Sequence, residues 1–198
     1  MTVRQKLLKL LYPVLMAVHR VTGKKKILRN KSEARPVIPF YSLFIQLNNG
    51  QLLSFQTLRG KKVMLVNTAS DCGYTAQYAE LQALYEKAGG NLEIIAFPAN
   101  DFREQEKRSD EEIENFCRQY FSIRFRLAKK SSVVKSENQN TIFKWLSSKD
   151  QNGWNDQQPT WNFCKYLVDE RGFLTHFFDQ GVPPLDEEVT KAAGIKAP

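Results

Sequence analysis

The sequence is poor in cysteine and histidine, and both shortages narrow the chemistry that it supports. It has three cysteines, Cys72, Cys117 and Cys164, which are too few for the disulfide framework of a small secreted scaffold. Its two histidines, His19 and His176, stand far apart, and neither has cysteines or carboxylates at a metal-ligand spacing. We therefore expect no metal centre and no bound cofactor.

A long uninterrupted apolar stretch is also missing, and this decides how the N-terminal segment is interpreted. Apolar residues recur there at helical spacing on one broad face: Leu7, Leu8, Leu11, Val14, Leu15, Val18 and Val21. Because Pro13 would kink a helix, the run is too short and too interrupted for a membrane span of about 20 residues. Lys9 and the poor cleavage site Ala17-Val18-His19 argue against a signal peptide. We predict an interfacial amphipathic helix, with a helix packed on its own domain or a disordered leader as the alternatives.

Positive charge is confined to that segment. The whole chain has a net charge of +8, but residues 1–35 carry ten basic residues and one acidic residue, so residues 36–198 are close to neutral. Because the body is near neutral, the positive charge of the whole chain is no evidence for nucleic-acid binding. We predict two parts, a basic amphipathic segment (1–35) and a folded domain (36–198), in a cytoplasmic protein with peripheral contact to anionic membranes.

Cys72 lies between a predicted buried strand and a predicted helix. Residues 63–66 (Val-Met-Leu-Val) are typical of a buried strand, and apolar residues return at helical spacing from Tyr78 to Ala88. At such a strand-to-helix turn, unpaired N–H groups and the helix dipole favour a thiolate. Thr75 occupies the second position of a Cys-x-x-Cys pair, so a disulfide partner must lie far along the chain. The sequence predicts a reactive cysteine, with a buried structural cysteine as the alternative.

The order of the predicted elements is that of an α/β domain. A strand at 63–66, a helix at 78–88 and a strand at 92–97 predict a parallel βαβ unit. The other predicted elements are a hairpin at 40–55 with an Asn-Gly turn, helices at 109–121 and 140–147, strands at 161–168 and 173–178, and a closing helix at 186–193. We therefore expect a central mixed β-sheet flanked by helices.

Two further segments matter for the site. The loop 98–106 leaves the carboxyl end of the sheet, which is the edge where open α/β sheets bind ligands. Ser109 and Glu112 form a capping box, which begins a helix with Cys117 on its apolar face. On spacing alone, the simplest interpretation of Cys117 is core packing.

Three separated motifs resemble those of the glutathione peroxidase family. They are Asn67-Thr68-Ala69-Ser70-Asp71-Cys72-Gly73-Tyr74-Thr75, then Phe97-Pro98-Ala99-Asn100 with Gln105-Glu106, and finally Trp161-Asn162-Phe163. The resemblance runs in order through residues 39–190. It implies a thioredoxin-like peroxidase domain that reduces hydrogen peroxide and organic or lipid hydroperoxides to water or alcohols.

The resemblance also implies roles for individual residues. Cys72 matches the peroxidatic residue, in the place where some relatives have selenocysteine, and Gln105, Trp161 and Asn162 match the rest of the catalytic tetrad. Cys117 sits where the thioredoxin-dependent members carry a resolving cysteine. Thioredoxin or glutathione is therefore the implied reductant, and we interpret Cys164 as structural.

The sequence departs from the family pattern in two places near the tetrad. Asp101 replaces the glutamine of an Asn-Gln-Phe motif, and Lys107 and Arg108 replace a Pro-Gly pair, which changes the shape and charge of the loop. The loop that tetrameric relatives insert before the Trp-Asn motif is absent. We therefore expect a monomer or weak dimer with an open active-site face.

The matched residue types suit peroxide reduction. The amides and the indole are neutral donors, which stabilise a thiolate without titrating near pH 7. No histidine base accompanies the motifs, which argues against a Cys–His hydrolase. A sulfenic acid on Cys72 must be captured by a thiol, and Cys117 can do this if its helix unwinds locally.

Three other functions were weighed against this one. A peroxide sensor or relay, which passes its oxidation to a partner protein, would use the same cysteines. A disulfide reductase with a thioredoxin-like fold lacks support, because the Cys-x-x-Cys pair is missing. A purely structural membrane-associated module would leave the three motifs unexplained.

Overall fold

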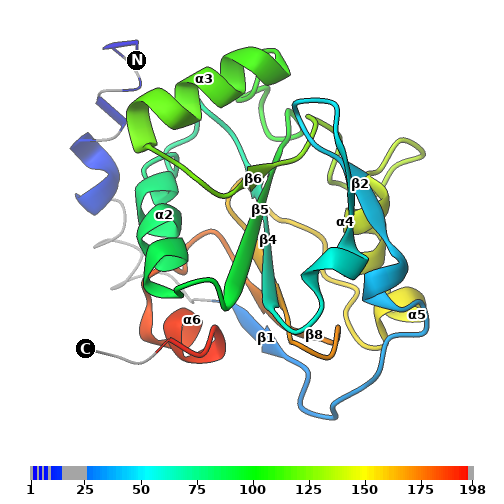
Figure 1. Ribbon diagram of the computed structural model, residues 1–198. Helices are drawn as coiled ribbons and strands as arrows, with labels where there is room; N and C mark the ends of the chain where they lie inside the picture. Colours follow the sequence, from blue (N-terminus) through cyan, green and yellow to red (C-terminus); the bar gives the residue numbers. More distant parts are fainter. Residues whose placement is uncertain (1, 4, 6, 9, 15–25, 196–198) are drawn as a thin grey trace.

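A six-stranded mixed sheet forms the centre of the protein (Figure 1). The computed structural model describes residues 2, 3, 5, 7, 8, 10–14 and 26–195. In spatial order the strands are β1 (Ile27–Arg29), β8 (Leu174–Phe178), β7 (Lys165–Val168), β4 (Lys62–Thr68), β5 (Leu92–Pro98) and β6 (Arg126–Leu127). β4 pairs parallel with β5 and antiparallel with β7, which confirms both the parallel unit and the mixed sheet.

The predicted hairpin forms a separate small sheet. Its strands are β2 (Phe44–Gln46) and β3 (Leu52–Ser54), which pair antiparallel. Gly50 in the connecting turn has φ +85°, a left-handed conformation that glycine adopts without strain. The residues before and after the hairpin form short 3₁₀ turns, η1 (Phe40–Ser42) and η2 (Phe55–Leu58).

Two apolar layers cover the two faces of the sheet. Because side chains alternate along a strand, Met64 and Val66 of β4 enter one layer, and Val63 and Leu65 enter the other. The helices are α2 (Gln77–Lys87), α3 (Asp110–Phe121) and α6 (Glu187–Ala192) on the first face, and α4 (Thr141–Leu146) followed by α5 (Lys149–Asn152) on the second (Figure 1). Both layers are apolar and rich in aromatic residues, so the sheet is a well-packed platform for the loops at its carboxyl end.

The N-terminal helix packs on the body with its apolar side outward. The described residues between 3 and 14 are helical, and Figure 1 shows them beside α2. Gln5 and Tyr12 are buried, whereas the exposed side chains are Val3, Leu7, Leu10, Leu11 and Val14. Of the residues predicted to share one apolar face, Leu7, Leu11 and Val14 are exposed, whereas Leu8 is half-buried and lines a cavity beside Cys72. The remaining predicted members, at positions 15, 18 and 21, lie outside the described residues. No helix within the described ranges is long and apolar enough to cross a membrane.

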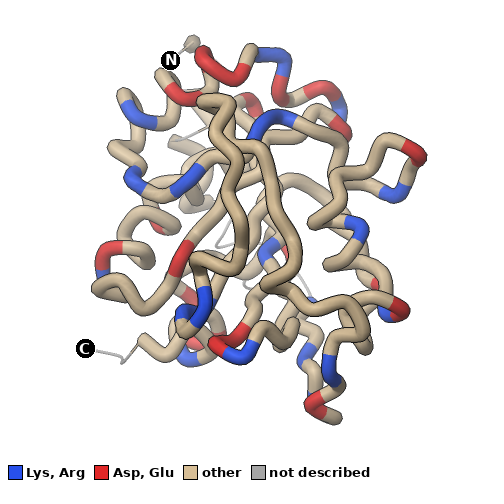
Figure 2. The backbone as a smooth tube through the Cα atoms, turned by 45° about the vertical axis from the view of Figure 1, so that its right-hand side comes forward, with Lys and Arg blue, Asp and Glu red and all other residues tan. Residues whose placement is uncertain are grey.

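Part of the basic N-terminal segment belongs to the central sheet. β1 was not predicted from the sequence, yet its Leu28 is the register partner of Phe177 in β8. Over the described chain, basic positions are interspersed with acidic ones (Figure 2). The division of the chain at residue 35 stays a prediction, with β1 as a contact between its two parts.

The helix that carries Cys117 starts at the predicted capping box. Ser109 Oγ accepts a hydrogen bond from Glu112 N (3.2 Å), and Glu112 Oε2 accepts one from Ser109 N (2.8 Å). Acidic side chains in the first turn of α3 also suit the positive end of the helix dipole. The start of α3 is therefore fixed by local chemistry.

We expect Ser109→Ala to lower the free energy of unfolding by about 1 kcal/mol, because an N-cap side chain and its reciprocal partner are lost. Urea denaturation followed by circular dichroism measures this change. The exposed Ser136→Ala serves as the control and should leave the midpoint in place. Equal midpoints for both variants would contradict a stabilising role of the box.

Candidate active site

Cys72 lies on the turn between β4 and α2, as predicted. The Thr75 hydroxyl accepts a hydrogen bond from Cys72 N (3.1 Å) and lies within 2.9 Å of Ala69 O. The side chain that replaces the second cysteine of a Cys-x-x-Cys pair therefore braces the turn. Cys72 itself is fully buried, and its Sγ accepts a hydrogen bond from Tyr74 N (3.4 Å).

Burial and hydrogen bonding act on the Cys72 thiol in opposite directions. Burial raises its pKa, whereas N–H donors lower it: the backbone of Tyr74, then the side chains of Trp161 and Asn162, then the backbone of Gly73. The net direction is upward. A helix N-terminus alone suggested a depressed pKa, so this part of the sequence expectation is wrong for the closed, reduced protein, because desolvation outweighs the donors.

A single buried amide positions the segment that carries Trp161 and Asn162. Asn67, near the end of β4, donates from Nδ2 to Trp161 O (2.9 Å) and accepts from Cys164 N at Oδ1 (3.1 Å). Its backbone carbonyl accepts a hydrogen bond from Phe163 N (2.6 Å). Phe163 has φ +69°, a left-handed conformation that is rare for an aromatic residue. Asn67 thus holds the chain in a strained turn beside Cys72.

Gln105 reaches the same place from the loop after β5. Its side-chain Oε1 accepts a hydrogen bond from Asn162 Nδ2 (3.0 Å), and its backbone carbonyl accepts one from Asp71 N (3.0 Å). Arg103 and Glu104, which precede it, both have positive φ values (53° and 52°). The structure therefore brings all four predicted residues of the tetrad together, with Gln105 linked to Cys72 through Asn162.

The departures from the family pattern have local partners. Asp101 accepts hydrogen bonds from Ser132 Oγ and Val133 N (both 2.8 Å), which secures the loop after β5. Arg108 forms an ion pair with Asp71 (3.1 Å), the residue directly before Cys72. These replacements leave the tetrad in place and add a charged contact at its edge.

A buried carboxyl group supports the same turn. Glu106 Oε2 accepts hydrogen bonds from Ser70 N (2.8 Å) and Ser70 Oγ (2.7 Å). Burial raises the pKa of Glu106, opposed by these two donors and by Arg108, whose guanidinium lies 4.0 Å from its other oxygen. Glu106 therefore ties the loop after β5 to the Cys72 turn.

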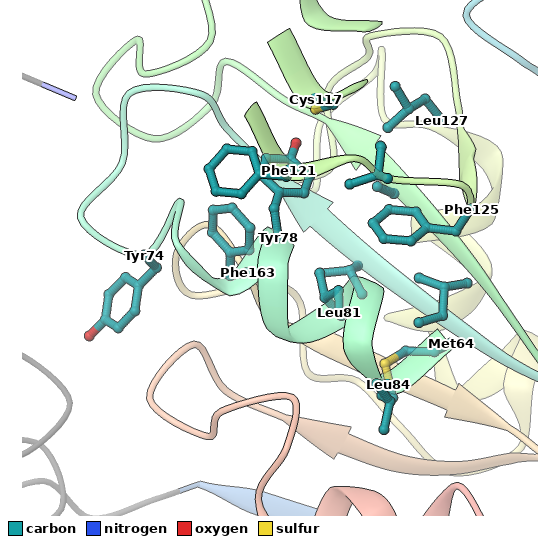
Figure 3. Close-up of a cluster of buried hydrophobic side chains, with 14 of the residues drawn as sticks. Met64, Tyr74, Tyr78, Leu81, Leu84, Cys117, Phe121, Phe125, Leu127 and Phe163 are labelled. Atoms are coloured by element: carbon teal, nitrogen blue, oxygen red, sulfur yellow. The ribbon is translucent and has the colours of Figure 1, made fainter. Parts of the chain in front are cut away.

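Cys117 is buried inside α3, in the same apolar layer as Cys72. Figure 3 shows it with Tyr78 and Phe121 in that layer. Burial raises the pKa of Cys117 to about 12, with the Tyr78 side chain opposing that shift. All three cysteines are buried free thiols.

Cys164 faces the other apolar layer. It is fully buried, and its Sγ lies 3.7 Å from Thr160 Oγ1 and 3.6 Å from Gln180 Oε1. Cys164 and Cys117 therefore lie in different apolar layers, on opposite faces of the sheet.

Sequence reasoning missed two buried polar residues near the site. Asn67 stands at the start of the first motif, but the sequence predicted no role for it. Lys165 was predicted only as part of the strand at 161–168. The Lys165 ammonium group is fully buried, bonds Gln77 Oε1 (2.8 Å) at the start of α2, and also bonds Val182 O. Burial lowers its pKa to about 8. A lysine at a strand position flanked by apolar residues was the available signal.

Comparison with known proteins agrees with this arrangement. Residues 40–147 match the family model described as glutathione peroxidase. The chain is 37% identical over 153 residues to glutathione peroxidase-like peroxiredoxin 2 of Saccharomyces cerevisiae, covering 76% of this chain and 94% of the relative. It is 41% identical to glutathione peroxidase-like peroxiredoxin HYR1 of the same yeast, over 67% of this chain and 82% of that one.

A solved structure extends the likeness to the fold. The crystal structure of T. cruzi GPX1 superposes with a TM-score of 0.60 at 21% identity, covering 79% of this chain and 97% of that one. The sheet, with helices on both of its faces, is the thioredoxin-like fold expected from the sequence. The family model and the yeast relatives together establish that the chain belongs to the glutathione peroxidase family and is a peroxidase.

Proposed function

We propose that Cys72 is the peroxidatic residue, that Gln105, Trp161 and Asn162 assist it, and that Cys117 resolves the oxidised form. The observation that carries this proposal is the geometry beside the Cys72 turn, where Asn67 holds the backbone of Trp161 and Gln105 accepts a hydrogen bond from the Asn162 amide. The Trp161 and Asn162 side chains also lower the pKa of the Cys72 thiol, against the effect of burial. Preorganised donors stabilise negative charge on sulfur without reorganisation during the reaction.

The oxidation step needs the thiolate form of Cys72. The thiolate attacks one peroxide oxygen, the O–O bond breaks, and the leaving oxygen takes a proton to become water or an alcohol. Cys72 becomes a sulfenic acid. Because burial raises the pKa of the thiol, the reactive fraction increases with pH, and donors that lower this pKa accelerate the reaction at neutral pH.

Resolution then consumes the sulfenic acid. The Cys117 thiol attacks Cys72, an S–S bond forms, and the hydroxyl group leaves as water. An intramolecular disulfide is a substrate for a dithiol, so we infer thioredoxin in preference to glutathione as reductant. The two yeast relatives are glutathione peroxidase-like peroxiredoxins, which supports this choice.

We also infer peripheral binding of the N-terminal segment to an anionic bilayer. Val3 and Leu10 of the helix are 85% and 74% exposed, and three further apolar side chains of this helix are exposed with them. The surrounding segment carries a large excess of basic residues. A helix with an exposed apolar row in a basic segment is the type of helix that binds the surface of anionic bilayers. Lipid hydroperoxides in such a bilayer are the substrate class that this placement favours.

Cys72→Ser should abolish peroxide turnover, while Trp161→Phe and Asn162→Ala should each slow oxidation about 10²–10³-fold at neutral pH. Both donor variants should move the pH–rate curve to higher pH, because each lost donor raises the pKa of Cys72 further. Stopped-flow oxidation across pH measures both effects. Trp154→Phe is the matched control, since its indole bonds Leu174 O. Unshifted pH–rate curves in both variants would refute the proposal that Trp161 and Asn162 donate hydrogen bonds to Cys72.

After one equivalent of peroxide, mass spectrometry should find a Cys72–Cys117 disulfide. Cys117→Ser should keep one fast oxidation of Cys72 and lose turnover with thioredoxin, because no dithiol-reducible bond forms. Cys164→Ser is the control and should keep both the Cys72–Cys117 disulfide and turnover with thioredoxin. Turnover of Cys117→Ser with glutathione alone would instead identify glutathione as the reductant.

Full-length protein should bind anionic vesicles in a salt-sensitive manner. Leu7→Gln/Leu10→Gln/Leu11→Gln should weaken vesicle binding at least about tenfold, since burial of one leucine contributes roughly 1.5–3 kcal/mol. Val37→Gln, which changes a 71%-exposed residue of the body, is the control. Substitutions are preferable to deletion of residues 1–35, which would also remove β1. If the wild type, the triple variant and Val37→Gln pellet equally with vesicles, the apolar row of the helix does not bind the bilayer.

A further inference from the structure

The N-terminal helix is fastened across the Cys72 turn. We define the strap as the described residues 2, 3, 5, 7, 8 and 10–14. Gln5 Nε2 donates to Asp71 Oδ1 (2.6 Å) and lies 3.4 Å from Ser70 O, both directly before Cys72. Tyr12 donates its hydroxyl hydrogen to Glu80 Oε1 (2.7 Å) on α2. These two buried polar side chains anchor the strap at separate points.

The strap also closes a small cavity against the reactive cysteine. The cavity is lined by Gln5, Leu8, Ser70, Cys72, Thr75, Ala76 and Phe121. Leu8 comes from the strap, Cys72 from the turn, and Phe121 is the last residue of α3. The strap therefore rests on both segments that would have to approach each other to join Cys72 to Cys117.

A chain of contacts links the strap anchor to α3. Asp71 binds Gln5 through Oδ1 and Arg108 through Oδ2 (3.1 Å). The Arg108 guanidinium lies 5.1 Å from the centre of the Phe116 ring, and Phe116 directly precedes Cys117. Unwinding of α3 around Cys117 would displace Phe116 and Phe121 together. It would remove the ring beneath Arg108 and one wall of the cavity beneath the strap.

We propose that the strap is a redox-responsive latch, which is docked in the reduced enzyme and released when the Cys72–Cys117 disulfide forms. This inference rests on the proposed resolving role of Cys117. The chemistry is that of resolution alone: the Cys117 thiol and the Cys72 sulfenic acid give a disulfide and one water. The latch adds a mechanical condition to this step: the strap must dissociate from the Cys72 turn and from α2 before α3 can unwind fully.

Hydrogen–deuterium exchange of the peptide that contains residues 2–14 tests release. In the full-length wild type, one equivalent of peroxide should speed exchange in this peptide at least about tenfold, since a docked helix then becomes exposed to solvent. Cys117→Ser should be oxidised at Cys72 with no such change. Unchanged exchange in a wild type that contains the disulfide would overturn the latch and leave the resolving role intact. If the disulfide is absent, the proposed resolving role fails, and the latch fails with it.

The anchors provide a second test that does not depend on release. Gln5→Ala/Tyr12→Phe should form the disulfide about fivefold faster or more, because one net hydrogen bond corresponds to roughly a fivefold change in an equilibrium constant. Gln46→Ala/Tyr85→Phe is the matched control, removing the same groups away from the strap. Quenched-flow mass spectrometry follows the bond. Equal rates in the two variants would overturn the mechanical condition, and thermal melts verify that both variants are folded.

Discussion

The Asn67 amide is the interaction on which the site depends. It belongs to β4, a central strand that pairs with β5 and β7, and it uses its donor and its acceptor on the segment that carries Trp161. These bonds, together with burial of the Phe163 ring against Tyr78, offset the strained backbone of Phe163. The rigidity of the sheet is thereby transferred to the indole and amide that act on Cys72. Removal of this amide would misplace the donors while leaving every tetrad residue present.

The state of Cys72 is a balance between desolvation and directed hydrogen bonds. In the closed protein desolvation prevails, so the thiol form is favoured. The donors already lower this pKa in the buried site, but by less than burial raises it. A site of this kind couples reactivity to opening: any movement that hydrates Cys72 lowers its pKa, while Trp161 and Asn162 remain in position to stabilise the charge that appears.

Elements specified by local sequence could be predicted, and those specified by distant partners could not. The apolar run of β4 and the capping box of α3 are local, and both were predicted correctly. β1 has three residues within a basic segment, and it becomes a strand only because β8 offers a free edge. Packing of the N-terminal helix on its own domain was left open as an alternative for a similar reason. Its contacts are made by Gln5 and Tyr12, whose partners Asp71 and Glu80 are remote in sequence.

The same limit applies within the site. The residue types of the tetrad could be identified from motifs, but the upward pKa of Cys72 depends on how much protein surrounds the sulfur. The buried ammonium of Lys165 is tolerated because Gln77 and the Val182 carbonyl receive it, and no neighbour in sequence reveals them.

The apolar row on the outer side of the N-terminal helix has a consequence for how copies of the protein meet. Five exposed side chains, Val3, Leu7, Leu10, Leu11 and Val14, form a strip that the described part of the chain leaves uncovered. In water, such a strip favours pairing with the strip of a second copy. Two copies paired in this way would hide the surface that a bilayer needs. The lipid binding that we propose and such pairing would therefore compete for the same five side chains, so added anionic vesicles would shift the protein from paired to single molecules.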